Sequence, residues 1–347
     1  MKSTITHPIK KILVLRPDRL GDVILTLPVV RNLHKSFPHA SITYLCTKYT
    51  SQILESYSLI SNLIIYEREN EHKGFKKILN LAKKLREYNF DLAVHLLPRY
   101  PLALATYLAQ IKYTIGTGFR WYSFIFTHRQ YDHRKYNLYH EAEYNLRLLR
   151  KLGIDSNYNS DVYSYIKFPK TVAESVQKII TNKLSGRPYI ILHPGSGGSS
   201  INWPLTNFIR LTKLLNGWGK FEVCVTGVVA EEEFLENFYQ SDAKFINLVG
   251  EFDLNELAEF LRSGKLFISN STGPLHLAVA TGTKVLGLYP NSPGLGPGRW
   301  GPFGDPTSSY MTPVIDQAKP LTDPINNNME NITPEMVFER IKLILRE

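Results

Sequence analysis

A chain of 347 residues with 43% hydrophobic residues is long enough for two folded domains, and its net charge of +10 favours an anionic partner. The two cysteines, Cys46 and Cys224, lie in apolar runs without metal-ligand spacing, which argues against a disulfide framework and a zinc site. Because the first residues lack the apolar core of a signal peptide, and no run reaches the roughly 20 apolar residues that span a bilayer, we expect a cytoplasmic globular protein.

The first half of the chain alternates short apolar runs with amphipathic segments, the pattern of parallel strands joined by helices. Strands are predicted at 12–16, 41–46, 63–66 and 91–96. Helices are predicted at 23–34, 50–57, 73–88 and 140–152. This half is therefore expected to form a parallel sheet with helices on both faces.

Asp22 begins a predicted helix directly after a strand, in a turn that also contains Arg16, Asp18 and Arg19. An acid in this place is either a helix-start residue favoured by the helix dipole or a catalytic carboxylate at the rim of a cleft. The residues alone leave both interpretations open.

The alternation breaks between Lys112 and His140, a stretch that we call the aromatic-basic segment. Its aromatic rings and cations include Arg120, Trp121, Arg129, Arg134 and Lys135. Such a mixture suits an anionic glycolipid, a membrane surface or single-stranded nucleic acid, whereas the alternative is a solvated loop with a few core aromatics. No recognised nucleic-acid motif accompanies it, so we expect no nucleic-acid partner.

After a turn-rich linker at 153–170, the second half repeats the alternation. Strands are predicted at 189–193, 221–225, 245–248, 266–268 and 285–288. Helices are predicted at 172–183, 205–215, 231–239, 253–261, from 274 onward and from 333 to 346. The glycine run at 293–298 is read as a loop. A second doubly wound sheet is expected.

Two turns of this second half could bind an oxyanion. The glycine-rich stretch 194–200, with Ser196 and Gly197, follows a strand and exposes backbone amides. The second turn opens the helix after 266–268, where Ser271 or Thr272 can cap the first amides, and its anion-binding candidates are Thr272, Gly273, Pro274 and His276. The alternative for the second turn is an ordinary strand-to-helix connection with a buried histidine.

The chain contains six short motifs that are informative as a set. They are residues 16–22 (RPDRLGD), 193–196 (HPGS), 203–204 (WP), 270–276 (NSTGPLH), 299–302 (RWGP) and 332–335 (ITPE). In this order and spacing the chain resembles glycosyltransferase family 9, the ADP-heptose:lipopolysaccharide heptosyltransferase group, along nearly its full length.

The resemblance implies the GT-B fold, an α/β fold of two Rossmann-like doubly wound domains with a cleft between them. Residues 1–168 would form the acceptor-binding domain and 169–330 the nucleotide-sugar domain, and the helix in 331–347 would pack back toward the first domain. Asp22 falls on the general base of the family, and 272–276 falls on its donor diphosphate site.

The activity implied is transfer of a sugar, heptose, from an ADP-activated donor to the lipopolysaccharide core or a related glycolipid, with inversion and without an obligatory metal or cofactor. Donor contacts are expected at Ser196, Gly197, Thr272, Gly273, Pro274 and His276. Acceptor contacts are expected at Arg19, Arg120 and Arg134. The enzyme would be a monomer that meets its acceptor at the cytoplasmic face of the inner membrane.

Two positions depart from the family pattern. Ile201 stands where the family usually has a lysine, and Ser271 stands where an acid is common. Without the lysine, Arg19, Lys265, Arg299 or a bound cation would have to balance the leaving diphosphate. The departures leave two alternatives open, a GT-B transferase with another nucleotide-sugar and a catalytically impaired nucleotide-sugar-binding scaffold.

Overall fold

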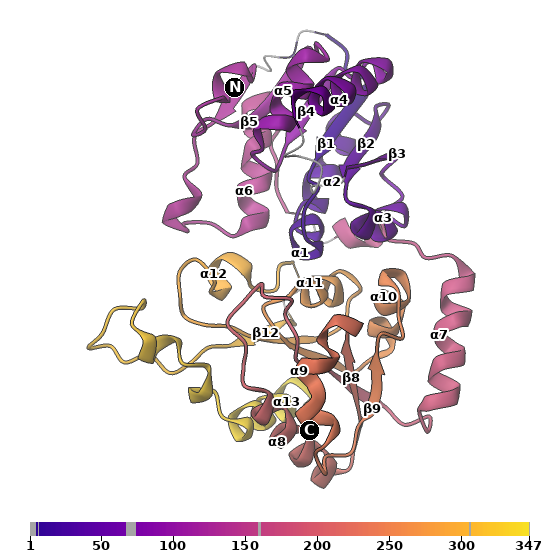
Figure 1. Cartoon of the computed structure of the whole chain (residues 1–347), viewed down its shortest axis with the longest axis vertical. Helices are drawn as coiled ribbons and strands as arrows, with labels where there is room; N and C mark the ends of the chain where they lie inside the picture. The colour runs from indigo at the N-terminus through magenta and orange to yellow at the C-terminus, as the bar shows by residue number, and fades with distance from the viewer. Residues whose placement is uncertain (1–4, 6, 67–73, 159–160, 305–306, 347) are drawn as a thin grey trace. The chain divides into compact units, whose positions relative to one another are not determined.

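The computed structural model describes residues 5, 7–66, 74–158, 161–304 and 307–346. The chain divides into two compact units, Met1–Lys167 and Phe168–Glu347, and each is built on a six-stranded parallel sheet (Figure 1). No helix in these ranges is both long enough and apolar enough to pass through a bilayer.

The first sheet has the order β3-β2-β1-β4-β5-β6. Its strands are β1 (Lys11–Leu15), β2 (Ser41–Cys46), β3 (Asn62–Ile65), β4 (Leu92–His95), β5 (Tyr113–Thr117) and β6 (His128–Gln130). The central strands are continuous buried runs because helices cover both faces of a parallel sheet. The order reverses between β1 and β4, so the carboxyl ends of these two strands flank the crevice where doubly wound sheets bind ligands.

The helices of this unit largely follow the apolar periodicity. They are α1 (Leu20–Ile24), α2 (Leu27–Ser36), α3 (Lys48–Glu55), α4 (Phe75–Tyr88), α5 (Tyr100–Leu108) and α6 (Glu141–Leu148). The single helix predicted at 23–34 is wrong: Pro28 has no N–H and lies in the first turn of α2, so the chain forms two helices. Residue 73, the predicted start of α4, lies outside the described residues.

The aromatic-basic segment is not a plain loop. It contains β5 and β6 with two 3₁₀ turns, η2 (Ser123–Ile125) and η3 (Arg134–Tyr136). Of these, β6 is a three-residue edge strand paired with β5. The sheet therefore carries this segment at one of its edges.

The second sheet repeats the first, with the order β12-β11-β10-β7-β8-β9. Its strands are β7 (Tyr189–His193), β8 (Glu222–Gly227), β9 (Ile246–Val249), β10 (Leu266–Asn270), β11 (Val285–Leu288) and β12 (Ser309–Met311). The reversal falls between β7 and β10, the two strands that precede the predicted anion-binding turns.

Seven α-helices are described in the second unit. They are α7 (Lys170–Lys183), α8 (Leu205–Trp218), α9 (Glu232–Tyr239), α10 (Leu254–Ser263), α11 (Gly273–Ala280), α12 (Pro297–Trp300) and α13 (Pro334–Leu345). The loop predicted at 293–298 is partly wrong, because Pro297 starts the single turn α12. Helix α13 packs on α8 within this unit, and its return toward the first domain stays a prediction.

The fully buried indole of Trp203 ties the end of the chain to the second sheet. Its Nε1–H donates to the carbonyl oxygen of Ile332 at 2.7 Å, just before α13, and its backbone N–H donates to Asn270 Oδ1 at 2.7 Å. The Asn270 side chain in turn donates to the carbonyl of Pro194 at 2.7 Å. One buried network thus holds the loops after β7 and β10.

We predict that Trp203→Phe lowers the free energy of unfolding, by about 1–3 kcal/mol from the buried Ile332 carbonyl left without a donor. Trp218→Phe is the control for ring size, because Trp218 is only half-buried and contacts Phe221 and Phe338 through its ring. Denaturant unfolding followed by circular dichroism measures both. Equal losses in the two variants would contradict the structural role of the indole N–H.

Candidate active site

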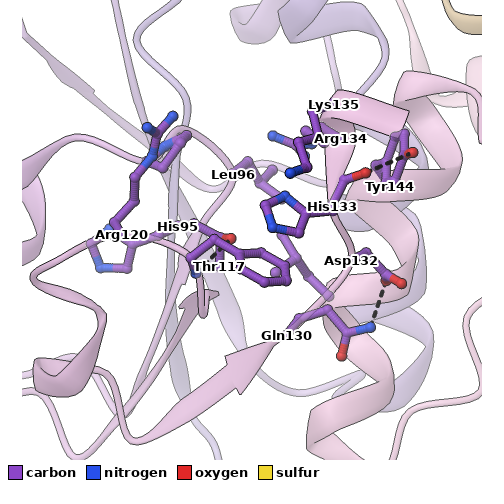
Figure 2. A pocket seen from close by; sticks show the side chains of 13 residues that line it. His95, Leu96, Thr117, Arg120, Gln130, Asp132, His133, Arg134, Lys135 and Tyr144 are labelled. Atoms are coloured by element: carbon purple, nitrogen blue, oxygen red, sulfur yellow. Dashed lines mark hydrogen bonds between the residues drawn. The ribbon is translucent and has the colours of Figure 1, made fainter. Parts of the chain in front are cut away.

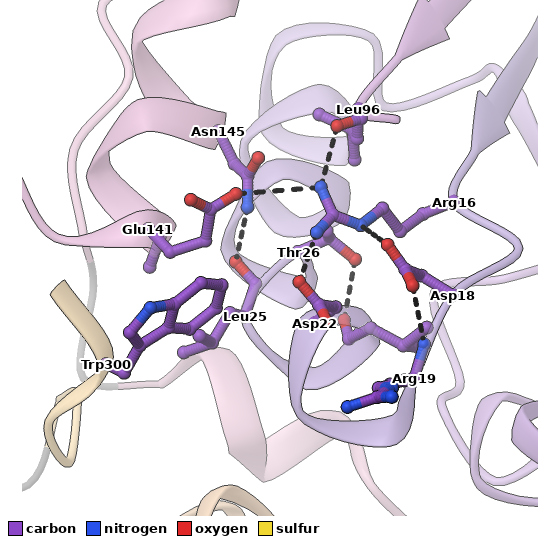
Figure 3. A network of polar contacts seen from close by, with 12 residues as sticks. Arg16, Asp18, Arg19, Asp22, Leu25, Thr26, Leu96, Glu141, Asn145 and Trp300 are labelled. Atoms are coloured by element: carbon purple, nitrogen blue, oxygen red, sulfur yellow. Dashed lines mark hydrogen bonds and ion pairs between the residues drawn. The ribbon is translucent and has the colours of Figure 1, made fainter. Parts of the chain in front are cut away.

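A buried guanidinium joins the two sides of the crevice in the first sheet. Arg16 directly follows β1 and is only 4% exposed. Its Nη1–H donates to the carbonyl oxygen of Leu96, directly after β4, at 2.7 Å. Figure 3 shows this guanidinium at the centre of a polar network, with Asp22 and Glu141 among its neighbours.

Three carboxylates surround Arg16. Its Nη2 contacts Asp22 Oδ1, its Nε lies 3.2 Å from Asp18 Oδ2, and its Nη1 lies 3.6 Å from Glu141 Oε1. Burial raises the pKa of Asp22, Arg16 lowers it, and the negative charges of Asp18 and Glu141 raise it further; the net shift is upward. Asp22 is thereby a stronger proton acceptor than an ordinary carboxylate.

Glu141 was not predicted as a site residue. It is the first residue of α6, whose N-cap His140 accepts a hydrogen bond from the amide of Ala142, and its side chain is only 1% exposed. Glu141 Oε1 lies 3.4 Å from Arg134 Nη2, which also donates to Asn145 Oδ1 at 2.8 Å. An acid in the first turn of a helix is usually read as a dipole effect, so sequence reasoning overlooked its two guanidinium partners.

A cavity of about 280 Å³ opens beside this network, at the end of the sheet that carries the carboxyl ends of β4 and β5 (Figure 2). Its lining residues are His95, Leu96, Pro98, Thr117, Phe119, Arg120, Gln130, Asp132, His133, Arg134, Lys135, Tyr144 and Leu148. Two of the three predicted acceptor residues, Arg120 and Arg134, thus line one cavity. The third, Arg19, is exposed and is not among the lining residues.

The charge of this cavity is positive. Its one acidic lining residue, Asp132, accepts hydrogen bonds from Arg147 at 2.8 and 2.9 Å and from Gln130. Burial raises the pKa of Asp132, but these bonds outweigh it and lower the pKa overall. The negative charge of Asp132 is balanced by Arg147. Because Arg134 is paired with Glu141, Arg120 and Lys135 leave an excess of positive charge that suits an anionic ligand.

The second unit brings the predicted donor residues to the crevice between β7 and β10. Besides the bond from Asn270 to Pro194, the Ser199 hydroxyl donates to the carbonyl oxygen of Ser271 at 3.0 Å. These bonds hold the loop with Ser196 and Gly197 against the turn that starts α11. The residues brought together here are Ser196, Gly197, Thr272, Gly273, Pro274 and His276.

Capping of α11 by a hydroxyl, which the sequence predicts, is not found. Thr272 is the N-cap, but its side chain makes no cap hydrogen bond and its Oγ1 lies 3.4 Å from the Ser269 hydroxyl. The extended backbone of Thr272 directs its side chain into the buried base of the turn. The side chain of Thr272 therefore does not cap the first turn of α11.

Glu231 is a second acid that sequence reasoning overlooked. Its carboxylate accepts hydrogen bonds from the amides of Gly197 at 3.3 Å and Val228 at 3.1 Å, and it lies 4.0 Å from His193 Nε2. A Cβ at Gly195 would collide with this carboxylate, which explains the glycine there. The amide of Gly197 would have to leave Glu231 to bind a donor phosphate.

The proposed compensation by Lys265 for the missing lysine is wrong. Lys265 directly precedes β10 and its amide donates to Tyr189, so it lies at the amino end of the sheet. The turn at Ser271 follows the other end of the strand, about 20 Å away at 3.3 Å per residue. Within the described ranges, no group of three or more His, Cys, Asp or Glu side chains could hold a metal ion.

The chain is similar to several known proteins. The sequence model described as glycosyltransferase family 9 (heptosyltransferase) matches residues 78–320. A Haemophilus influenzae protein provisionally named a glycosyltransferase is 28% identical over 97% of each chain. Lipopolysaccharide heptosyltransferase 3 of Escherichia coli K12 is 26% identical over 78% of this chain and 79% of its own length.

A solved structure extends the comparison to the fold. The structure of E. coli ADP-heptose lipopolysaccharide heptosyltransferase II has a TM-score of 0.76 at 20% identity and covers 97% of this chain and 98% of its own. The predicted class, two doubly wound α/β units of the GT-B type, is confirmed.

The raised pKa of Asp22 predicts a pH-dependent stability. Folding favours the protonated form of such a carboxyl, so the stability that it contributes is present below the unfolded pKa and is lost as pH rises through the folded pKa. Asp22→Asn stays neutral, and it leaves Arg16 and Arg134 with two carboxylates, Asp18 and Glu141.

We therefore expect the Asp22→Asn variant to unfold at a higher urea concentration than the wild type at pH 7. The difference in the free energy of unfolding should disappear as pH falls through the raised pKa of Asp22. Urea unfolding over a pH series measures it. A stability loss in Asp22→Asn that is constant with pH would contradict the raised pKa of Asp22.

Proposed function

Because the chain belongs to glycosyltransferase family 9, we propose that it transfers heptose from ADP-heptose to a lipopolysaccharide-core or related glycolipid acceptor, with inversion at the anomeric carbon. The observation that carries the proposal is Asp22, a carboxylate of raised pKa that lies at the ligand-binding crevice of one unit beside a cationic cavity. The names of the E. coli relatives support the donor and the acceptor class.

Asp22 acts as the general base in this proposal. It accepts the proton of the acceptor hydroxyl as that oxygen bonds to the anomeric carbon, while the bond from this carbon to the diphosphate oxygen breaks and ADP leaves. Attack from the face opposite the diphosphate inverts the centre. A base with a pKa raised toward the working pH is suited to this transfer, because it combines the right protonation state with a stronger pull on the proton.

The donor diphosphate binds at the turn before α11. The side chain of Thr272 does not cap the first turn of α11, and the dipole of the helix favours an anion there. The Ser196 hydroxyl is buried and has no hydrogen-bond partner among the described residues, so it can contact the same diphosphate. These backbone and hydroxyl groups take over the role that a lysine at position 201 would have; Ile201 is 43% exposed.

The acceptor binds to the first unit. The cavity beside Arg120 and Arg134 has room for a single sugar or anionic group, and its positive charge suits the phosphates or sugar acids of a glycolipid core. Arg19, exposed in the same turn as Asp22, would contact the acceptor outside the cavity.

The lipid part of the acceptor places the reaction at the cytoplasmic membrane face. The aromatic-basic segment exposes Trp121 and Phe124, 72% and 68% exposed, and both rings favour the bilayer interface. Basic residues near an anionic bilayer gain about 1 kcal/mol each, so the segment supports peripheral attachment.

The role of Asp22 is tested by activity. Asp22→Asn keeps the shape of the side chain but cannot take a proton, so transfer should fall by about 10²–10⁴-fold with donor affinity unchanged. Asp18→Asn removes the same charge from the same guanidinium and should cost far less. Activity of Asp22→Asn within about tenfold of the wild type would reject the base and favour the helix-start role, whose loss costs about 0.5–1 kcal/mol of stability.

The donor site is tested by calorimetric titration with ADP. Gly273→Val should weaken ADP binding because the branched side chain blocks the approach of a phosphate to the amides of α11. His276→Ala should weaken the free energy of ADP binding by about 1.5–3 kcal/mol if it removes a hydrogen bond to a charged phosphate. Gly294→Val is the control, since a Cβ there meets no atom within 4 Å. Unchanged ADP affinity in the first two variants would reject this donor site, and tighter binding of UDP or GDP would identify another donor.

Membrane attachment is tested by sedimentation with anionic vesicles. Arg129→Glu with Lys135→Glu, both exposed, should weaken vesicle binding, and the difference should shrink as salt rises. The matched control reverses Lys170 and Lys178, two exposed lysines of α7. If both double variants bind vesicles like the wild type, the aromatic-basic segment is a solvated basic surface.

A further inference from the structure

A single buried oxygen atom lies between two guanidinium groups of the first unit. Glu141 Oε1 is 3.6 Å from Arg16 Nη1 and 3.4 Å from Arg134 Nη2. The side chain is only 1% exposed, and the capped start of α6 holds its backbone. Glu141 therefore cannot turn to solvent when one of its partners changes.

Both guanidinium groups also have other contacts. Arg134 also lines the cavity, together with Arg120, His133 and Lys135, so an anion that enters the cavity competes with Glu141 for Arg134. Arg16 also contacts Asp22 and Asp18. If Arg134 moves from Glu141 toward an anion in the cavity, a closer contact with Arg16 must balance the negative charge of Glu141.

Three carboxylates, Asp18, Asp22 and Glu141, compete for one guanidinium group, that of Arg16. Of the three, Glu141 also contacts Arg134. A closer contact of Arg16 with Glu141 weakens its contact with Asp22.

We propose that Glu141 is a positioning residue that sets how closely Arg16 contacts Asp22 and couples this contact to an anionic group in the cavity. The inference rests on the proposed role of Asp22 as the base. When the phosphate or sugar acid of an acceptor engages Arg134, Glu141 draws Arg16 from Asp22, and Asp22 becomes a stronger base. The carboxylate is thus most basic when the acceptor is in place.

The groups that face Asp22 determine the sign of the expected effect. Arg16 and Asp18 face it from its own turn, and Glu141 faces it from α6; Arg16 lowers the pKa of Asp22, and the two acids raise it. Tyr44 of β2, near Arg16, keeps its proton because burial raises its pKa, and its hydroxyl is hydrogen-bonded to Thr26. Removal of the Glu141 charge must therefore lower the pKa of Asp22, and an anion beside Arg134 must raise it.

The test is a carboxyl-carbon NMR titration of the full chain with labelled aspartate, in which Asp22→Asn assigns the Asp22 signal. Glu141→Gln should lower the pKa of Asp22 by about half a unit to one unit, below the 1–3 units of a charge in direct contact. Inorganic phosphate, as the cavity probe, should raise this pKa in the wild type and much less in Glu141→Gln. The control is Glu143→Gln on the same helix, because Glu143 is exposed and accepts a hydrogen bond from the amide of His140 in the capping box.

An Asp22 pKa that is the same in Glu141→Gln and Glu143→Gln, or an equal phosphate effect in both, would overturn the coupling. Glu141→Asp moves the charge one methylene farther from both guanidinium groups, so it should lower the pKa of Asp22 by less than Glu141→Gln does. If Glu141→Gln fails to fold, phosphate must raise the pKa of Asp22 less in Glu141→Asp than in the wild type, and an equal rise overturns the inference. The readout does not depend on turnover. An active Asp22→Asn enzyme would therefore reject the role of Asp22 as the general base, but it would not contradict the coupling between Glu141 and Asp22.

Discussion

The candidate active site depends on the burial of one guanidinium group in the crevice of a parallel sheet. Arg16 follows β1 and bonds to the chain after β4, so it spans the point where the strand order reverses. A buried cation is stable only with carboxylate partners, and here these partners include the acid that we assign as the base. The ion pairs of Arg16 therefore also adjust the basicity of Asp22.

In the second unit, a neutral side chain joins the two sides of the crevice. Asn270 ends β10 and uses its amide to hold both the loop after β7 and the backbone of Trp203. The acid of this crevice, Glu231, bonds to the amide of Gly197 in the loop after β7. A donor diphosphate at the start of α11 would therefore have to displace this carboxylate from Gly197.

The sequence predicts the sheets well because buried parallel strands are continuous apolar runs, as in β1 and β7. It does not predict α5, which is apolar on most sides and lacks a helical period. It also does not predict the strands β5, β6 and β12, of which β6 and β12 are three-residue strands at the edges of their sheets. The motif residues that follow strands are found at the crevices, because the carboxyl ends of parallel strands share one edge. Glu141 and Glu231 were missed because their roles come from partners distant in sequence, Arg16 and Gly197, that only the fold brings near.

We propose that the nucleotide binds to the second unit and the acceptor to the first. Hydrogen exchange of the whole chain with and without ADP tests it most directly, because amides that bind phosphate or are covered by the nucleotide exchange more slowly. We predict that ADP slows exchange in residues 194–200 and 271–280 and leaves residues 95–148 unchanged. Slower exchange in 95–148 with no change at the two predicted donor loops would contradict the account.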